Sequence, residues 1–141
     1  MRTKMRTVSL IVAVILALDQ LTKVLISHLL VLHESVPVMA PFFLTLTGVA
    51  IVALLLFLRQ ADGANRLLVV ALAAVLGGAV GNLIDRILYG EVIDFLLFHW
   101  HGYYWPAFNV ADSCITLGVI GLLWSSVQEH RAEKNYGRFA S

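Results

Sequence analysis

The sequence predicts an all-α integral membrane protein with four transmembrane helices and small segments outside the membrane. Three observations support this prediction: an apolar composition, four long apolar segments, and an uneven distribution of positive charge. Of the 141 residues, 60% are hydrophobic and 13% are charged, whereas charged residues make up roughly 25% of an ordinary soluble domain. At this length we expect a single domain over residues 1–141.

The apolar segments run over about residues 8–32, 42–58, 67–87 and 109–127. A helix needs about 20 apolar residues to cross a bilayer, in a range of roughly 17 to 25. The second segment has 17 residues and is at the short limit. The first begins like a signal peptide, with Arg2, Lys4 and Arg6 before an apolar run, but no A-x-A-like cleavage site follows. We therefore expect an uncleaved first helix.

Positive charges predict the orientation of these helices. Eight of the ten Lys and Arg residues precede the first segment, lie between the second and third, or follow the fourth. The connections 33–41 and 88–108 contain no Lys or Arg. Because cytoplasmic loops are rich in these residues, we expect both termini in the cytoplasm and the two connections outside.

Several function classes are not supported. The net charge is +1 and no basic run occurs, so we expect no nucleic-acid partner. Cys114 is the single cysteine, which excludes an internal disulfide and a CxxC metal clamp. His99 and His101 lie among aromatic residues, as interfacial residues do, and a metal needs three or four ligands. We therefore expect no metal site.

Polar residues gather where the third and fourth segments reach the outer surface. Asp85 is 18 residues past Leu67, about 27 Å along a helix. Ionisable residues inside membrane helices are costly, usually face the bundle interior and mark function. The residues at this depth are Asn82, Asp85, Arg86, Asp94, Asn109 and Asp112, with Asp19 and Lys23 deeper in the first segment.

Asp94 and Asp112 are the best candidates for catalysis among these residues. Neither has a Lys or Arg three or four positions away that would neutralise it. Two carboxylates that approach closely share one proton, because the charge of the first disfavours ionisation of the second. Such a pair holds an acid and a base together, so that the base can activate a water and the acid can protonate the substrate.

The same residues also allow plainer roles. Asp112 can be a first-turn acid favoured by the helix dipole, with Asn109 as the helix cap. Asp94 can be a solvated loop residue, although its neighbours in "VIDFLLF" are apolar.

Two further pairs and a glycine motif have structural interpretations. Asn82 and Arg86 share a helix face, and Arg86 can snorkel to the headgroups. Asp19 and Lys23 are spaced for a buried ion pair that fixes helix packing, which is the interpretation we favour. The spacing of Gly77 and Gly81 predicts close helix–helix contact.

Four stretches resemble the bacterial lipoprotein signal peptidase family, also called signal peptidase II. They are "DQLTK" (19–23), "GGAVGNLIDR" (77–86), "GEVIDF" (90–95) and "FNVADSCITLG" (108–118), and they occur in the family's order. The resemblance implies a single membrane-embedded peptidase domain: an aspartyl endopeptidase of the bacterial inner membrane, active near the outer, periplasmic face. It would remove signal peptides from diacylglyceryl-modified prolipoproteins, before the lipidated cysteine, as a monomer without metal or cofactor.

Carried over residue by residue, the resemblance makes Asp94 and Asp112 the catalytic pair. Asp19, Lys23, Asn82, Arg86 and Asn109 become the supporting and substrate-binding residues. The chain lacks the family's Asn-x-Gly-x-Ala-Phe motif between the first two helices, in a segment that helps to hold substrate. An inactive relative or scaffold is therefore an alternative. A small ion-coupled carrier is another, but the two halves show no repeat of the kind carriers contain.

Overall fold

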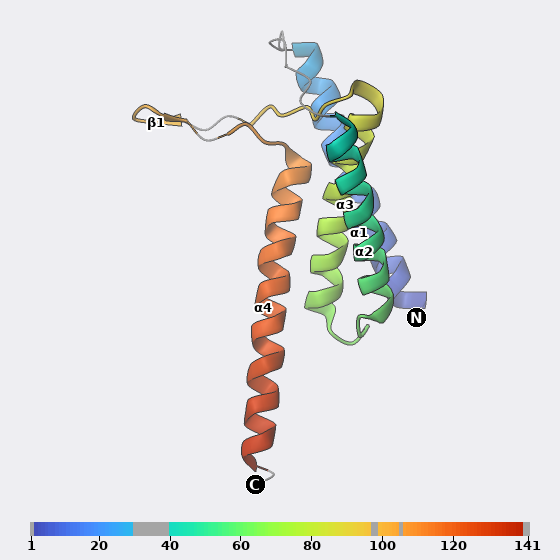
Figure 1. The fold of residues 1–141 in the computed structure, drawn as a ribbon, viewed down its shortest axis with the longest axis vertical. Helices are drawn as coiled ribbons and strands as arrows, with labels where there is room; N and C mark the ends of the chain where they lie inside the picture. Colours follow the sequence, from blue (N-terminus) through green and yellow to red (C-terminus); the bar gives the residue numbers. More distant parts are fainter. Residues whose placement is uncertain (1, 30–39, 97–98, 105, 140–141) are drawn as a thin grey trace.

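The computed structural model describes residues 2–29, 40–96, 99–104 and 106–139. Within these ranges the chain forms four long helices and a short hairpin (Figure 1). The helices are α1 (Arg2–Leu29), α2 (Ala40–Gln60), α3 (Arg66–Tyr89) and α4 (Val110–Phe139), and the hairpin strands are β1 (His99–Trp100) and β2 (Tyr103–Tyr104). All four helices are long and apolar enough to cross a membrane, which confirms the predicted fold class. The orientation of the termini stays a prediction.

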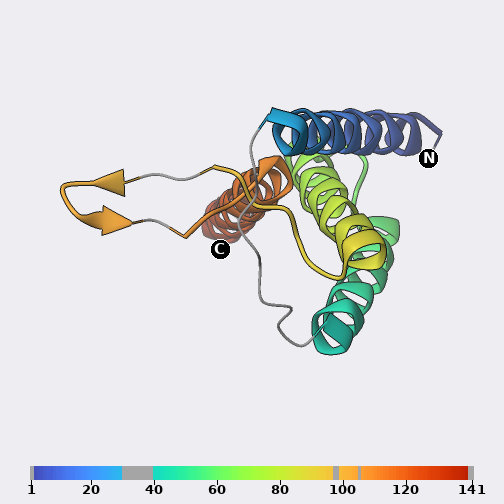
Figure 2. The same cartoon turned by 90° about the horizontal axis from the view of Figure 1, so that it is seen from above.

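Helix α3 is the centre of the bundle. It packs against α1, α2 and α4, and the view from above places it among the other three (Figure 2). In the most apolar stretch of α3, 61% of the residues are buried inside the protein. The corresponding share is 6% in α2, 17% in α1 and 17% in α4. Because apolar side chains cover the outside of the other helices, their outer faces suit contact with lipid.

Glycines allow the helices to approach closely. A Cβ atom at Gly81 would lie 2.9 Å from Asp19 Oδ2, and one at Gly77 would lie 3.1 Å from Ile15 Cβ. This confirms the close contact predicted for the Gly77-x-x-x-Gly81 motif, and the partner is α1. Gly78 makes the corresponding contact with α4, because a Cβ added at this position would collide with the carbonyl oxygen of Ala111.

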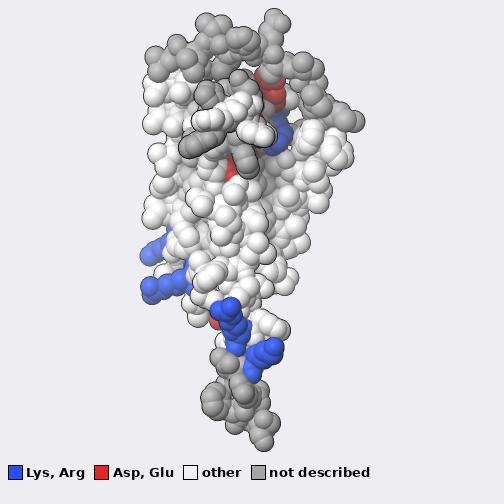
Figure 3. Space-filling view, turned by 90° about the vertical axis from the view of Figure 1, so that its left-hand side faces the viewer, with Lys and Arg blue, Asp and Glu red and all other residues white. Residues whose placement is uncertain are grey.

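Polar contacts fix the end of the bundle that lies far from the hairpin. Lys4 Nζ donates to the carbonyl oxygens of Leu58 and Ala61 over 2.9 Å each, and so satisfies carbonyls that the end of α2 leaves without helical partners. Asn65 caps α3 by accepting the Leu68 N–H, and its Nδ2 donates to Ser125 Oγ of α4 over 2.9 Å. On the face in Figure 3, most Lys and Arg side chains lie toward this end, beyond a broad uncharged band.

The connection between α3 and α4 brings a loop beside the start of α4. Gly90 ends α3 in the left-handed conformation, with φ 79°, which a residue without Cβ adopts at little cost. Leu96 and Phe108 then exchange backbone hydrogen bonds of 2.8 and 3.1 Å. Beyond this bridge the hairpin extends away from the bundle (Figure 2). The bridge therefore holds residues 91–96 next to residues 108–112. Trp105 and the connection 30–39 lie outside the described residues.

We expect Gly78→Ala to destabilise the bundle and Gly48→Ala to leave it intact. The Gly78 methyl group would meet the backbone of α4, so the free energy of unfolding should fall by about 1–3 kcal/mol. At Gly48 nothing lies within 4 Å of an added Cβ, and alanine favours the helix by about 1 kcal/mol. Thermal unfolding in detergent measures both variants. Equal losses at the two positions would show that the α3–α4 contact is not tightly packed.

Candidate active site

Asn109 and Asp112 together cap the start of α4. Asn109 Oδ1 accepts the Asp112 N–H over 2.9 Å, and Asp112 Oδ2 accepts the Asn109 N–H over 3.3 Å. Such reciprocal bonds satisfy N–H groups that the first helical turn leaves free. The plainer roles considered for both residues are therefore real. They leave Asp112 Oδ1 and the amide Nδ2 of Asn109 for other partners.

Two amide side chains connect Asp112 to Asp94. Asn82 of α3 donates from Nδ2 to Asp112 Oδ1 over 2.7 Å. Asn109 donates from Nδ2 to Asp94 Oδ1 over 2.7 Å and to Asn82 Oδ1 over 3.2 Å. Both asparagines are buried, so this network holds the carboxyl groups of a loop residue and a helix residue in one place.

Asp94 holds its proton more tightly than an ordinary aspartate. Partial removal of water from its carboxyl group, followed by the negative charge of Asp112, raises the pKa of Asp94 from 3.8 to about 6. The hydrogen bond from Asn109 and the charge of Lys23 act in the opposite direction, and a hydrogen bond with the Asp112 carboxyl raises the pKa further. Much of the residue's surface still reaches solvent, so protons can exchange with water.

A buried ionic group lies beneath this pair. Lys23 Nζ lies 2.6 Å from Asp19 Oδ2 and 2.6 Å from Asp85 Oδ2, and all three side chains are at most 2% exposed. Gln20 Nε2 donates to Asp85 Oδ1 over 2.9 Å. The ion pair expected between Asp19 and Lys23 is therefore present.

Sequence reasoning did not assign roles to Asp85 and Gln20 in this group. A usable signal was present for Asp85: it is a second acid at membrane depth, and Arg86, being adjacent, cannot share its helix face. Arg86 instead donates from Nη1 to the carbonyl oxygen of Asn82 over 3.2 Å. Each residue that the sequence singled out at this end, from Asp19 to Asp112, thus belongs to one connected polar region.

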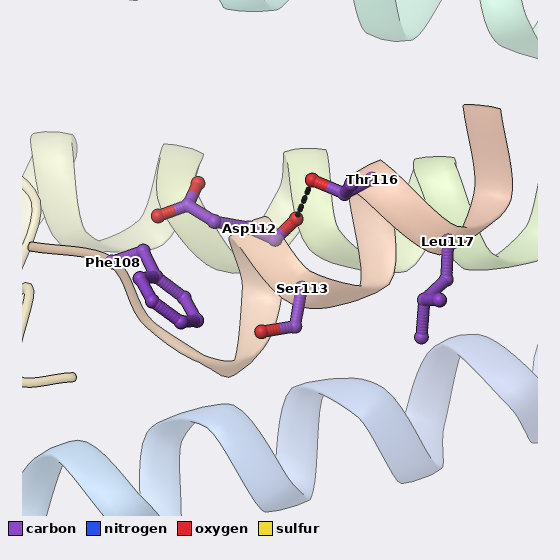
Figure 4. Close-up of a pocket in the computed structure, with 5 residues that line it drawn as sticks. All are labelled: Phe108, Asp112, Ser113, Thr116 and Leu117. Carbon is purple, nitrogen blue, oxygen red and sulfur yellow. Dashed lines mark hydrogen bonds between the residues drawn. The ribbon is translucent and has the colours of Figure 1, made fainter. Parts of the chain in front are cut away.

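Two cavities meet at Asp112. One, of about 390 Å³, is lined by Phe108, Asp112, Ser113, Thr116 and Leu117. In Figure 4 the side chains of Phe108, Ser113 and Leu117 point toward the side of α4 that faces α1. The other cavity, of about 300 Å³, is lined by residues of α2, α3 and α4, which include Asn82, Arg86 and Asp112. Most of the surface that lines each cavity is apolar.

Among the described residues, no three His, Cys, Asp and Glu side chains are placed to hold a metal ion together. The chemistry that the described site offers directly is that of the carboxyl pair.

This fold and site define a class: multi-pass membrane proteins with paired carboxylates at the end of a transmembrane helix. Comparison with known proteins shows which family within this class the chain resembles. The family model for signal peptidase (SPase) II matches residues 31–128. A protein of Syntrophotalea carbinolica named lipoprotein signal peptidase is 43% identical to this chain, and the match covers 90% of this chain and 96% of that protein. A protein of Geobacter metallireducens with the same name is 37% identical, and the match covers 94% of this chain and 98% of that protein.

Solved structures agree with this result. Two bacterial membrane enzymes determined by the in meso method superpose with TM-scores of 0.78 and 0.75, at 30% and 31% identity. The first match covers 88% of this chain and 89% of the other, and the second covers 84% and 91%. The chain belongs to the signal peptidase II family, as the resemblance in four sequence stretches predicted.

The raised pKa of Asp94 predicts a pH-dependent effect of Asp94→Asn on stability. A carboxyl whose folded pKa exceeds its unfolded pKa adds stability below about pH 4, and this is lost as pH rises through about 6. From pH 4 to pH 7.5 the stability of Asp94→Asn relative to the parent should therefore increase, by about 1 kcal/mol once solvent screening is allowed for. Thermal unfolding of both proteins across this range measures the difference. If the difference in stability between the two proteins does not change with pH, the pKa of Asp94 is not raised in the folded protein.

Proposed function

We propose that this protein is an aspartic endopeptidase that removes signal peptides from diacylglyceryl-modified prolipoproteins, before the lipidated cysteine. Asp94 and Asp112 are the proposed catalytic residues. The observation that carries the proposal is the network in which Asn82 and Asn109 join the two carboxyl groups. Membership of the signal peptidase II family and the names of the relatives support the substrate class.

The pair would work with one shared proton. Because the pKa of Asp94 is raised, Asp94 is the proposed acid, and Asp112 is the proposed base. Asp112 takes a proton from a water, whose oxygen attacks the scissile carbonyl carbon, while Asp94 donates its proton to the carbonyl oxygen. When the tetrahedral intermediate breaks, the carbon–nitrogen bond cleaves and Asp112 gives its proton to the leaving amine. Asp94 takes a proton back from a hydroxyl group of the intermediate as the new carboxyl group forms, which restores the starting state of the pair.

The two cavities support a substrate that is anchored in the membrane. Both are mainly apolar and Asp112 lines both, so an apolar peptide segment and acyl chains could lie against the helices beside the carboxyl pair. Asn82, Arg86 and Asn109, with Asp19 and Lys23 beneath them, are the proposed binding and supporting residues. Burial of apolar surface would supply most of the binding free energy.

The distribution of charge supports the proposed location. On the face in Figure 3, most Lys and Arg side chains lie toward the end of the bundle that is far from the hairpin, which indicates a cytoplasmic end under the positive-inside rule. We therefore place the carboxyl pair at the outer, periplasmic face of the bacterial inner membrane, in a multi-pass protein that acts as a monomer.

A second candidate is an inactive relative that keeps the fold. The alignment with the Syntrophotalea carbinolica protein spans 155 positions, more than the 141 residues of this chain, so that relative contains residues that this chain lacks. The absent Asn-x-Gly-x-Ala-Phe motif agrees with this difference. Loss of a substrate-holding segment would reduce substrate affinity and leave the carboxyl pair in place.

The test is cleavage of a diacylglyceryl-modified prolipoprotein by the purified protein in detergent or lipid. Asp94→Asn and Asp112→Asn should each lower kcat by about 10³-fold, because acid–base groups contribute 10²–10⁴-fold. The double variant should be no slower than either single variant, because the two groups act as a unit. Asp62→Asn is the matched control, since Asp62 is exposed in the loop between α2 and α3.

Each result separates the two candidates. Cleavage that depends on Asp94 and Asp112 but not on Asp62 supports the peptidase. A folded parent that leaves the substrate intact at all concentrations supports the inactive relative. Cleavage that persists in Asp94→Asn and Asp112→Asn would refute the assignment of the pair.

The pH dependence of cleavage follows from the same pair. Since Asp94 loses its proton above pH 6 or so, and the reaction needs that proton, kcat/KM should fall as pH rises through this value. The apparent pKa of this limb belongs to the pair and not to one residue. Initial rates between pH 4.5 and 8.5 measure it, and a rate that rises steadily over this range would contradict the proposed roles.

A further inference from the structure

The loop that carries Asp94 is attached to the buried ionic group through its backbone. Ile93, which immediately precedes Asp94, donates its N–H to Asp85 Oδ2 over 3.2 Å. Asp85 is fully buried in α3. Asp94 itself lies outside any helix, so helical hydrogen bonds do not fix its position. The bond to Asp85 is therefore a direct restraint on this part of the loop.

The start of α4 is attached to the same group in the same way. Ala111, which immediately precedes Asp112, donates its N–H to Asp19 Oδ1 over 2.9 Å. Ala111 and Asp19 are both fully buried. A Cβ at Gly81 would lie 2.9 Å from Asp19 Oδ2, so the carboxylate reaches Ala111 through space that the glycine leaves open.

Lys23 joins the two attachments. Its ammonium lies 2.6 Å from a carboxylate oxygen of Asp19 and 2.6 Å from one of Asp85. Gln20 Nε2 also donates to both carboxylates, over 3.3 and 2.9 Å. Among the described residues, no buried side-chain nitrogen or oxygen lacks a hydrogen-bond partner. Each carboxylate oxygen of Asp19 and Asp85 therefore has at least one donor.

We propose that Lys23, Asp19 and Asp85 form a positioning group that sets the separation of Asp94 and Asp112 through the Ile93 and Ala111 backbone bonds. The proposal rests on the function proposed above, because the separation matters for the shared-proton reaction. Asp85 is a positioning residue, since its carboxylate is buried and fully occupied. Its role is to hold the loop, and it does not touch the reacting atoms.

The physical reason is the sensitivity of catalysis to distance. A displacement of about 1 Å at a catalytic group can reduce the rate by about 100-fold. The α4 end of the pair is fixed by the helix, but the loop end depends on the Leu96–Phe108 bridge, on Asn109 and on Asp85. Loss of the Asp85 acceptor should therefore move Asp94 more than Asp112.

The experiment compares Asp85→Leu with Asp85→Asn in the full chain. In Asp85→Leu the acceptor for Ile93 is lost, but Lys23 keeps Asp19 as its counter-charge, so the buried group is electrically balanced. The Ile93 amide should then exchange its hydrogen at least about ten-fold faster, as expected for loss of one hydrogen bond. The value of kcat should fall about 100-fold with little change in KM. Asp85→Asn keeps an oxygen for Ile93 and should stay close to the parent in both measurements.

Asn65→Ala is the control for a general loss of stability. Asn65 caps α3 at the opposite end and bonds to Ser125 of α4. The variant should unfold at a lower temperature, with the Ile93 exchange rate and kcat unchanged. A merely structural role for Asp85 would make Asp85→Leu behave like this control.

The outcomes are distinct. Fast Ile93 exchange and low kcat in Asp85→Leu, with neither in Asp85→Asn or Asn65→Ala, support the positioning group. Unchanged Ile93 exchange or unchanged kcat in Asp85→Leu overturns it, and so does an Asp85→Asn variant as impaired as Asp85→Leu. If the parent cleaves no prolipoprotein, the proposed function fails. The Ile93 exchange rates then still decide whether Asp85 holds the loop.

Discussion

The end of the bundle that contains Asp94 and Asp112 depends on the buried ion pairs of Lys23 with Asp19 and Asp85. The Lys23 ammonium lies between two carboxylates from different helices, and each of these also accepts a backbone N–H from the α3–α4 connection or from α4. Removing the ammonium from this buried group would leave two carboxylates without a counter-charge, at a cost of about 3–5 kcal/mol. The same contacts that hold α1, α3 and α4 together therefore also place the residues beside Asp94 and Asp112.

Close helix packing makes this arrangement possible. Gly78 and Gly81 let α3 approach α4 and α1 until backbone and carboxylate atoms are in contact. The apolar exteriors of α1, α2 and α4 remain available to lipid, while the polar residues are concentrated at one end and connected to one another. In the proposed function, a lipid-anchored substrate would present its backbone at this polar end of the bundle.

The sequence predicts the fold class directly, because apolar segments of membrane-spanning length are encoded residue by residue. It also predicts Asp94 and Asp112 as the candidate catalytic pair, because neither has a cation at helical spacing. It does not predict the role of Asp85, whose partners Lys23 and Ile93 belong to another helix and to a loop. The short hairpin is likewise not predicted, since the aromatic run around Tyr103 indicates only an interfacial location. The role of Asp85 thus depends on contacts between segments that are distant in the sequence, and sequence periodicity does not show such contacts.

In the proposed reaction, Asp94 and Asp112 share one proton. Infrared difference spectroscopy of the protein in lipid, titrated from pH 4 to pH 8, tests this most directly. We expect one protonated carboxyl group to lose its C=O stretching band with an apparent pKa near 6, and we expect this change to be absent from the Asp94→Asn variant. No carboxyl titrating in this range, or an unchanged band in that variant, would contradict this sharing of a proton.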